Sequence, residues 1–204
     1  VVVLDNSGKS YQTLLKVEPQ GVIGEVLTIA EIDSEPEVHL RLMACVSQRD
    51  KYEWILQKGT ELGVNEFLPV ISQRTLVQQS AVIEKKRTRW ETILREASEQ
   101  SHRGKLPTLM PAMKFNEAIQ SGDDSIVRLI AHTSDSQSLK ATLGEHPATA
   151  YHLLVGPEGG FTAEEVQSAV QSGFRPVSLG KRILRMETAA LVIVNAVVFY
   201  SSND

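Results

Sequence analysis

The segment LLVGPEGGFTAEEV at residues 153–166 constrains the fold of this chain more than any other. Its apolar start is typical of a buried strand that ends at Val155, and GPEGG follows directly. Thr162, with Glu165 three residues later, forms the capping-box pattern that begins a helix. Three glycines in five residues allow a sharp turn and leave backbone N–H groups open to a ligand. We therefore predict a strand, a tight loop and a helix, as in a parallel α/β sheet.

A tight strand-to-helix turn that binds nothing explains these glycines equally well. If a ligand does bind, the loop argues against nucleotide phosphates, because it matches neither GxxxxGK[ST] nor GxGxxG. Glu158, Glu164 and Glu165 would also oppose the affinity of a helix N-terminus for phosphate. A ligand without phosphates that carries positive charge suits the loop better, and S-adenosylmethionine, a sulfonium, is such a ligand.

A second motif, SLGKRILRMETAALVIVNAVVFY, begins at Ser178. A strand ends at Leu179, Gly180 opens a turn, and Glu187 and Thr188 then begin a helix that is apolar all round. Such a helix in a protein of this composition is buried, either in the core or against a second copy of the chain. The basic residues before it are surface ion-pair partners or substrate clamps, and the sequence leaves both open: Lys181, Arg182 and Arg185.

The rest of the chain shows two different sequence patterns. The first 45 residues contain short β-branched runs separated by turn residues, which predict a small β-domain with a turn or linker at residues 33–37. From residue 46 helices and strands alternate, which predicts a parallel sheet with ligand sites at the strand carboxyl ends. Predicted helices cover residues 50–63, the amphipathic segment around Trp90, 162–172 and 187–200; predicted strands cover 66–71, which carries a proline and is expected near an edge, 125–132, 151–155 and 176–179.

Charge and composition exclude several classes of protein. The formal net charge is −4, yet residues 74–105 hold 8 basic and 4 acidic residues, which indicates either a solvated helix face or a phosphate-binding face. No apolar run is long enough to span a membrane, and no secretory signal precedes the first strand, so we expect a cytoplasmic protein. The single cysteine, Cys45, excludes an internal disulfide and a thiolate cluster; we expect a buried thiol and no metal site.

With both motifs in view, the sequence resembles the bacterial 16S rRNA (uracil-N(3))-methyltransferase (RsmE) family of the SPOUT superfamily of knotted methyltransferases. The resemblance rests on residues 153–166, Gly173–Phe174 and SLGKRILRMETAAL at 178–191. QKGTELGV at 57–64, Arg74 and ASEQSHR at 97–103 support it upstream. It extends from about Leu42 to the end of the chain.

The resemblance implies a fold with two parts. Residues 1–42 would form a PUA-like β-barrel RNA-binding domain, N-terminally incomplete because the family usually has further residues, some of them basic, before the position of Val1. Residues 43–204 would form the SPOUT domain, an α/β parallel sheet with a C-terminal deep trefoil knot.

The resemblance also implies the activity, which is S-adenosyl-L-methionine-dependent methylation of the N-3 imide nitrogen of a uridine in 16S rRNA. The enzyme would be a homodimer acting on the small ribosomal subunit, with the final apolar helix in its interface. Three loops would hold the methyl donor through His132, Thr133, Val155, Gly156, Glu158, Gly159, Gly160, Leu179, Gly180, Ile183, Leu184, Arg185, Thr188 and Ala189.

For catalysis, Arg185 and Arg182 would stabilise a uracil anion, and Glu187 would be a base, a helix cap or a ligand for the donor's amino group. RNA phosphates would be contacted by Arg74, Arg87, Arg89, Arg95 and Arg103. The competing hypotheses are a noncatalytic RNA-binding or ribosome-assembly protein, a nucleotide-phosphate enzyme, and a knotted methyltransferase acting on another RNA such as tRNA.

Overall fold

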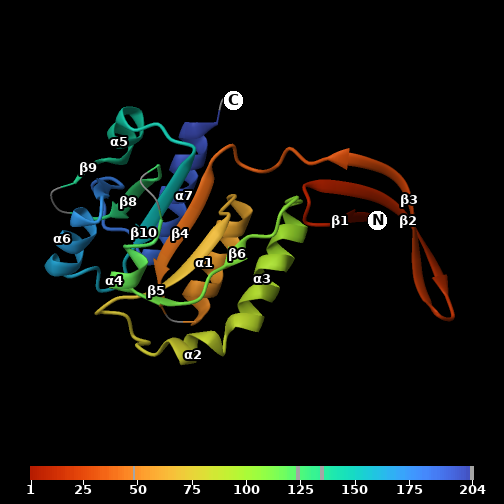
Figure 1. The fold of residues 1–204 in the computed structure, drawn as a ribbon, viewed down its shortest axis with the longest axis horizontal. Coiled ribbons are helices and arrows are strands. Elements are labelled where there is room, and N and C mark those ends of the chain that lie inside the picture. Colours follow the sequence, from red (N-terminus) through yellow and green to blue (C-terminus); the bar gives the residue numbers. More distant parts are fainter. Residues whose placement is uncertain (48, 123–124, 134–135, 203–204) are drawn as a thin grey trace.

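The computed structural model describes residues 1–47, 49–122, 125–133 and 136–202, which form two separate sheets (Figure 1). The first is antiparallel and consists of β1 (Val2–Leu4), β2 (Lys9–Glu18) and β3 (Gly21–Glu31). The second is parallel, and its strands alternate with helices as the sequence predicts. In chain order its elements are β4 (His39–Cys45), α1 (Arg49–Glu61), β5 (Glu66–Ile71), α2 (Ser80–Glu84), α3 (Arg87–Gln100), β6 (Thr108–Leu109), β7 (Met113–Lys114), α4 (Phe115–Ala118), β8 (Val127–Ala131), β9 (Gln137–Ser138), α5 (Leu139–Glu145), β10 (Ala150–Val155), α6 (Ala163–Gln171), β11 (Phe174–Ser178) and α7 (Met186–Ser201).

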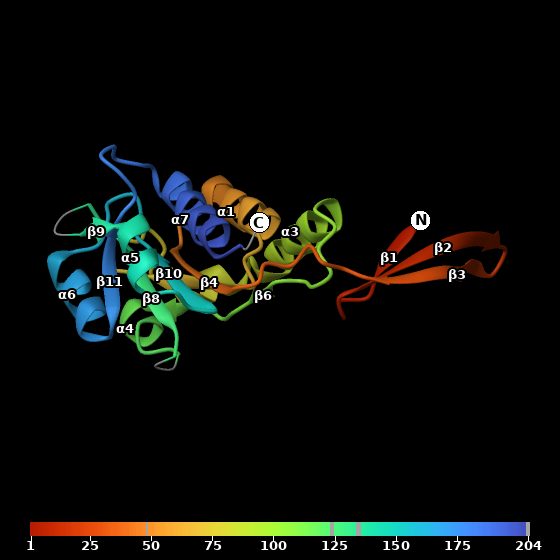
Figure 2. The same cartoon turned by 90° about the horizontal axis from the view of Figure 1, so that it is seen from above.

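The parallel sheet has the strand order β6-β5-β4-β10-β8-β11-β9, and β7 also pairs with β5. Its central strands are almost wholly buried because helices cover both faces: α1, α3 and α7 lie on one side, and α4 and α6 on the other (Figure 2). The strands β10, β8 and β11 are direct neighbours and run in the same direction, so their carboxyl ends share one edge of the sheet.

Strand β5 lies near an edge of the sheet, as Pro69 suggested. It pairs with β4 on one side, and only the two-residue strands β6 and β7 lie on the other. On the second side β6 pairs with Glu66 and Phe67, and β7 pairs with Val70 and Ile71. The two short strands therefore leave a gap at Pro69, the residue that has no N–H to donate.

Helix α7 is buried along one face only. Met186, Ala190, Ile193, Val194 and Val197 are buried, and the helix packs against α1, β4 and β10. Its other face exposes apolar side chains, of which Phe199 is the most exposed at 81%. The uniform hydrophobicity of this helix is therefore not explained by the core of a single chain.

Strands β2 and β3 form a ribbon that extends away from the α/β domain (Figures 1 and 2). Cross-strand partners on one face of the ribbon include Val17 opposite Val22 and Thr13 opposite Val26, and the three valines are exposed. Beyond the three residues of β1 the ribbon has only two strands, and isolated two-stranded ribbons are marginally stable in water.

The boundary between the two sheets lies within residues 32–38, not at residue 42 as the sequence analysis placed it. That position falls inside β4, which pairs with β5 and β10 in the parallel sheet. The error has a simple cause: an apolar strand pattern such as that of residues 38–46 identifies a strand but not its partner strands.

A group of polar contacts ties the small β-domain and its linker to the end of α3. Arg103 is only 4% exposed; its guanidinium binds both carboxylate oxygens of Glu35 at 2.6 and 3.3 Å and donates to the carbonyls of Thr60 and Val64. Asn6 Oδ1 accepts the Leu106 N–H at 2.6 Å. Arg103 thus connects the linker to two other segments of the chain.

Replacing Arg103 by alanine is expected to lower the free energy of unfolding by about 3 kcal/mol, because Glu35 and two backbone carbonyls lose their donor. Arg95→Ala is the matched control: Arg95 is exposed and has no ion-pair partner in the described part of the chain, so we expect a change below about 0.5 kcal/mol. Urea denaturation followed by circular dichroism measures both. Equal stability of the two variants would contradict this role of Arg103.

Candidate active site

Three loops meet at the carboxyl edge of the parallel sheet. They follow β8 at His132, β10 at Gly156 and β11 at Leu179, and the three strands are adjacent. Together the loops enclose a cavity of about 850 Å³, to which Lys51 of α1 and the start of α7 also contribute. Both the position and the volume are typical of a binding site for a small organic ligand.

The loop after β10 has the tight geometry that its glycines predict. Gly160 has a φ of 68°, in the left-handed region, and its N–H binds the carbonyl of Pro157 at 2.8 Å. At Gly156 an added Cβ would lie 3.1 Å from the ring of Phe161, which is buried beneath the loop. Side chains at either position would therefore change the cavity wall, at Gly160 through backbone strain and at Gly156 through a close contact.

The capping box predicted for the following helix is present. Thr162 Oγ1 accepts the Glu165 N–H at 3.2 Å, and Glu165 Oε2 accepts the Thr162 N–H at 2.9 Å. The other carboxylate oxygen of Glu165 accepts the N–H of Gln73 at 2.8 Å, so α6 is also tied to the loop after β5. Glu165 is consequently occupied by protein donors and does not face the cavity.

Arg74 supports the same loop from outside. Its Nη1 donates to the carbonyl of Gly159 at 2.7 Å and to that of Phe161 at 3.4 Å. Together, Arg74 and Glu165 hold the segment Gly159–Thr162 against the loop that follows β5. We call these two residues and their contacts the brace.

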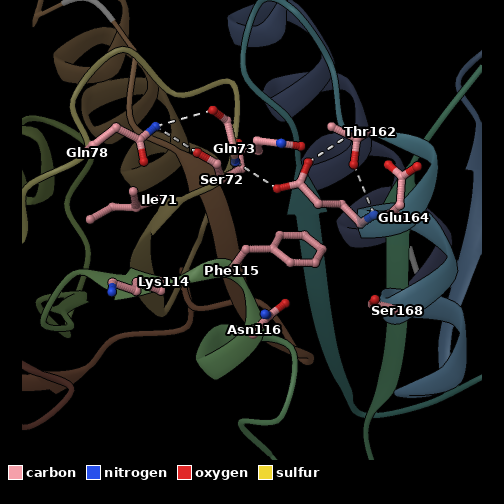
Figure 3. Close-up of a pocket in the computed structure, with 11 residues that line it drawn as sticks. Ile71, Ser72, Gln73, Gln78, Lys114, Phe115, Asn116, Thr162, Glu164 and Ser168 are labelled. Carbon is pink, nitrogen blue, oxygen red and sulfur yellow. Dashed lines mark hydrogen bonds between the residues drawn. The ribbon is translucent and has the colours of Figure 1, made fainter.

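Next to the brace lies a second, polar cavity of about 460 Å³, between the loop after β5, the start of α4 and α6 (Figure 3). Figure 3 shows Gln78 and Gln73 on one wall and Thr162 on the other. Gln78 donates to the backbone carbonyls of Ser72 and Gln73 on its own wall. The N–H groups of Gln73 and Thr162 both donate to the Glu165 carboxylate, which connects the two walls. These polar groups bind one another. The cavity lies between the loop after β5 and helix α6, which the brace connects.

The charged groups of the large cavity come from several elements. Lys51 Nζ lies 2.9 Å from Glu158 Oε1, and although partial burial raises the pKa of Glu158, hydrogen bonds from Lys51 and the backbone lower it overall. Arg182 and Arg185 line the cavity from the exposed segment before α7, with no ion-pair partner in the described ranges. Glu187 Oε2 is buried without a hydrogen-bond partner among them. A buried acceptor of this kind favours a ligand with a donor or a positive charge.

Comparison with known proteins identifies the family. A family model described as an RNA methyltransferase domain matches residues 34–198. Ribosomal RNA small subunit methyltransferase E of Mesomycoplasma hyopneumoniae is 30% identical over 89% of this chain and 78% of its own length. The protein of the same name from Synechocystis is 34% identical over 97% of this chain and 66% of its own length. The crystal structure of the Neisseria gonorrhoeae ribosomal RNA small subunit methyltransferase E, bound to S-adenosyl methionine, superimposes with a TM-score of 0.88 at 35% identity and covers 96% of this chain and 81% of that one.

This chain belongs to the ribosomal RNA small subunit methyltransferase E family.

The residues expected to bind the donor of this family gather at one place. All of them except Thr188 line the large cavity, and so do the expected catalytic residues Arg182, Arg185 and Glu187. Thr188 is an exposed residue in the first turn of α7, outside the cavity wall. Sequence analysis missed Lys51, which lies 107 residues before Glu158 and outside every motif on which the resemblance rests.

The five arginines expected to bind RNA do not form one free basic face. Arg103 is buried in the domain junction, which corrects the prediction that its side chain contacts RNA. Arg74 belongs to the brace. Arg89 makes a bidentate ion pair with Glu53 at 2.7 Å, and Arg87 binds the carbonyl of Leu109 and pairs with Glu91. A count of basic residues could not reveal these acidic and carbonyl partners.

Arg74→Ala is expected to loosen the glycine loop of this methyltransferase while leaving the fold intact. Hydrogen exchange at the amides of Gly160 and Thr162 should become at least about tenfold faster, because both amides are held by bonds within the segment that the brace fixes. Exchange measured by NMR or mass spectrometry, with Arg95→Ala as control, tests this. Unchanged protection of both amides would show that Arg74 does not hold the loop.

Proposed function

We propose that this protein is an S-adenosyl-L-methionine-dependent methyltransferase that methylates the N-3 nitrogen of a uridine in 16S rRNA of the small ribosomal subunit. The observation on which the proposal mainly rests is the three-loop cavity, found on a fold that superimposes with a TM-score of 0.88 on a relative crystallised with S-adenosyl methionine. The names of the curated relatives supply the substrate class.

The residues of the cavity fit this methyl donor. Its volume of about 850 Å³ lies within the range for ligands of this size, and its wall offers backbone groups at Gly156–Gly160 rather than a phosphate motif. Glu187 Oε2, a buried acceptor without a partner in the described residues, is suited to the donor's ammonium group. When bound, the donor supplies a methyl carbon attached to a positively charged sulfur.

The roles of the catalytic residues follow from what the acceptor nitrogen requires. The N-3 imide of uracil carries a proton and becomes nucleophilic only when that proton is lost. Arg182 and Arg185 line the cavity and are exposed, so their guanidinium groups can approach the imide edge and stabilise its negative charge. We assign Glu187 to donor binding rather than to helix capping or proton abstraction, because the residue lines the donor cavity and one of its carboxylate oxygens is buried without a hydrogen-bond partner in the described residues.

RNA contacts are assigned to the exposed basic side chains near α3. Arg95 is exposed, and Arg87 and Arg89 keep 35% and 56% of their side chains accessible despite their ion pairs with glutamates. Phosphates of the RNA would compete with these carboxylates for the guanidinium groups. Binding should therefore weaken steeply with salt, as expected for contacts to phosphate.

The second copy expected for this enzyme would bind at α7. Its outer face exposes Val192, Phe199 and Tyr200, and the adjacent helix α1 exposes Trp54. A homodimer that covers this face explains why α7 is apolar all round. The trefoil knot and the PUA-like character of residues 1–31 are proposed from family membership; the return of α7 from β11 to pack on β10 and α1 is consistent with such a knot.

Two variants are expected to separate donor binding from catalysis. Gly160→Val should weaken donor binding roughly 100-fold or more, because a β-branched residue is strained at a φ of 68°. Arg185→Ala keeps the backbone groups of the loop, through which the donor is expected to be held, and removes only the guanidinium. It should therefore leave the donor dissociation constant within about threefold while turnover on small-subunit RNA falls roughly 100-fold. Calorimetric titration with S-adenosylmethionine and single-turnover methylation measure these quantities.

Absence of donor binding to the parent protein at millimolar concentration would overturn the proposal and favour a noncatalytic RNA-binding role. Parallel loss of donor binding and turnover in both variants would instead contradict the assigned division of labour between the glycine loop and Arg185.

A further inference from the structure

Lys51 is a charged group of the large cavity that the family motifs do not include. It lies in the first turn of α1, far from the three loops in the sequence, and it forms part of the cavity lining. Its ammonium group is 2.9 Å from Glu158 Oε1, and the two side chains are 33% and 36% exposed. The cavity thus contains three cationic side chains, of Lys51, Arg182 and Arg185, among the residues that line it.

The backbone that carries Lys51 is held more firmly than that of Arg182. Its neighbours Tyr52, Ile55 and Leu56 are buried, and the ring of Tyr52 packs 4.6 Å from that of Trp90 on α3. Arg182 lies in a segment without helix or strand, in which Ile183 is 91% exposed. The core of the domain therefore fixes the backbone position of Lys51 relative to the cavity, as the helix α7 fixes that of Arg185 at its N-cap.

The ion pair with Glu158 contributes too little to stability to explain the position of Lys51 at the cavity. Ion pairs between partly exposed side chains contribute little to stability, and the glycine loop is already held by Arg74 and Glu165 from the other side. A lysine held loosely by one carboxylate at the cavity wall can change partner when an anion arrives. Uracil that has lost its imide proton is such an anion, and a fixed cation close to it lowers the free energy of the charged state.

We propose that Lys51 is a catalytic residue whose ammonium group stabilises the uracil imide anion during methyl transfer. The inference rests on the proposed function. In the step, the N-3 proton passes to water, the freed lone pair forms the bond to the methyl carbon, and the S–CH₃ bond breaks with its electron pair remaining on sulfur. Lys51 keeps its own proton throughout, so its part is electrostatic.

Lys51→Met removes the charge and keeps much of the side-chain volume. We expect the single-turnover rate on small-subunit RNA to fall roughly 100-fold, while the donor dissociation constant stays within about threefold. The limb of the rate profile that rises with pH should move to higher pH, because the imide loses a cation that favours its ionised form. Lys51→Arg should restore the rate to within about tenfold of the parent, since it retains the positive charge.

Lys58→Met is the matched control, because Lys58 lies on the same helix, pairs with Glu61 at 2.7 Å and is outside the cavity. Its rate and pH profile should equal those of the parent. A Lys51→Met rate equal to the parent's would overturn the inference alone. So would donor binding that weakens in proportion to the rate with no change in pH profile, because Lys51 would then act only by holding Glu158. A parent protein without methyl transfer would overturn the proposed function and this inference with it.

Discussion

The parallel pairing of β10, β8 and β11 is the constraint on which the site depends. Backbone hydrogen bonds hold these strands side by side and in one direction, so the loops after Ala131, Val155 and Ser178 emerge at the same edge of the sheet. Residues nearly 60 positions apart in the chain, such as His132 and Ala189, consequently line one cavity. The glycines shape the wall of that cavity, but the sheet decides that a cavity exists there.

The fold also decides which basic residues bind protein groups and which remain exposed. The basic residues of 74–105 are largely used within the protein: Arg103 joins the two domains, Arg74 supports the glycine loop, and Arg89 binds a carboxylate. Arg182 and Arg185, which have no ion-pair partner in the described residues, instead line the cavity. A buried arginine without a partner is strongly destabilising, so Arg103 must bind protein groups. A guanidinium that is buried and paired in this way is not accessible to RNA phosphates.

Local patterns predicted local structure well. The capping box of Thr162 and Glu165, the strand ending at Val155 and the helix after Arg185 are each set by neighbouring residues, and each is present. Partners distant in sequence could not be predicted in the same way. The sheet to which β4 belongs, the burial of Arg103 and the approach of Lys51 to Glu158 all depend on contacts between segments dozens of residues apart. For the same reason the sequence predicts the glycine loop but not the brace, whose contacts join residues more than 80 positions apart.

The central claim is that the cavity at the edge of the sheet directs a methyl group to N-3 of one uridine in small-subunit rRNA. The most direct test uses small ribosomal subunits from a strain that lacks the gene, incubated with the purified protein and methyl-labelled S-adenosylmethionine. Digestion of the rRNA to nucleosides should then yield labelled 3-methyluridine, and subunits from the parent strain should accept little label because their site is already methylated. Label in another nucleoside, or none in either preparation, would contradict the account.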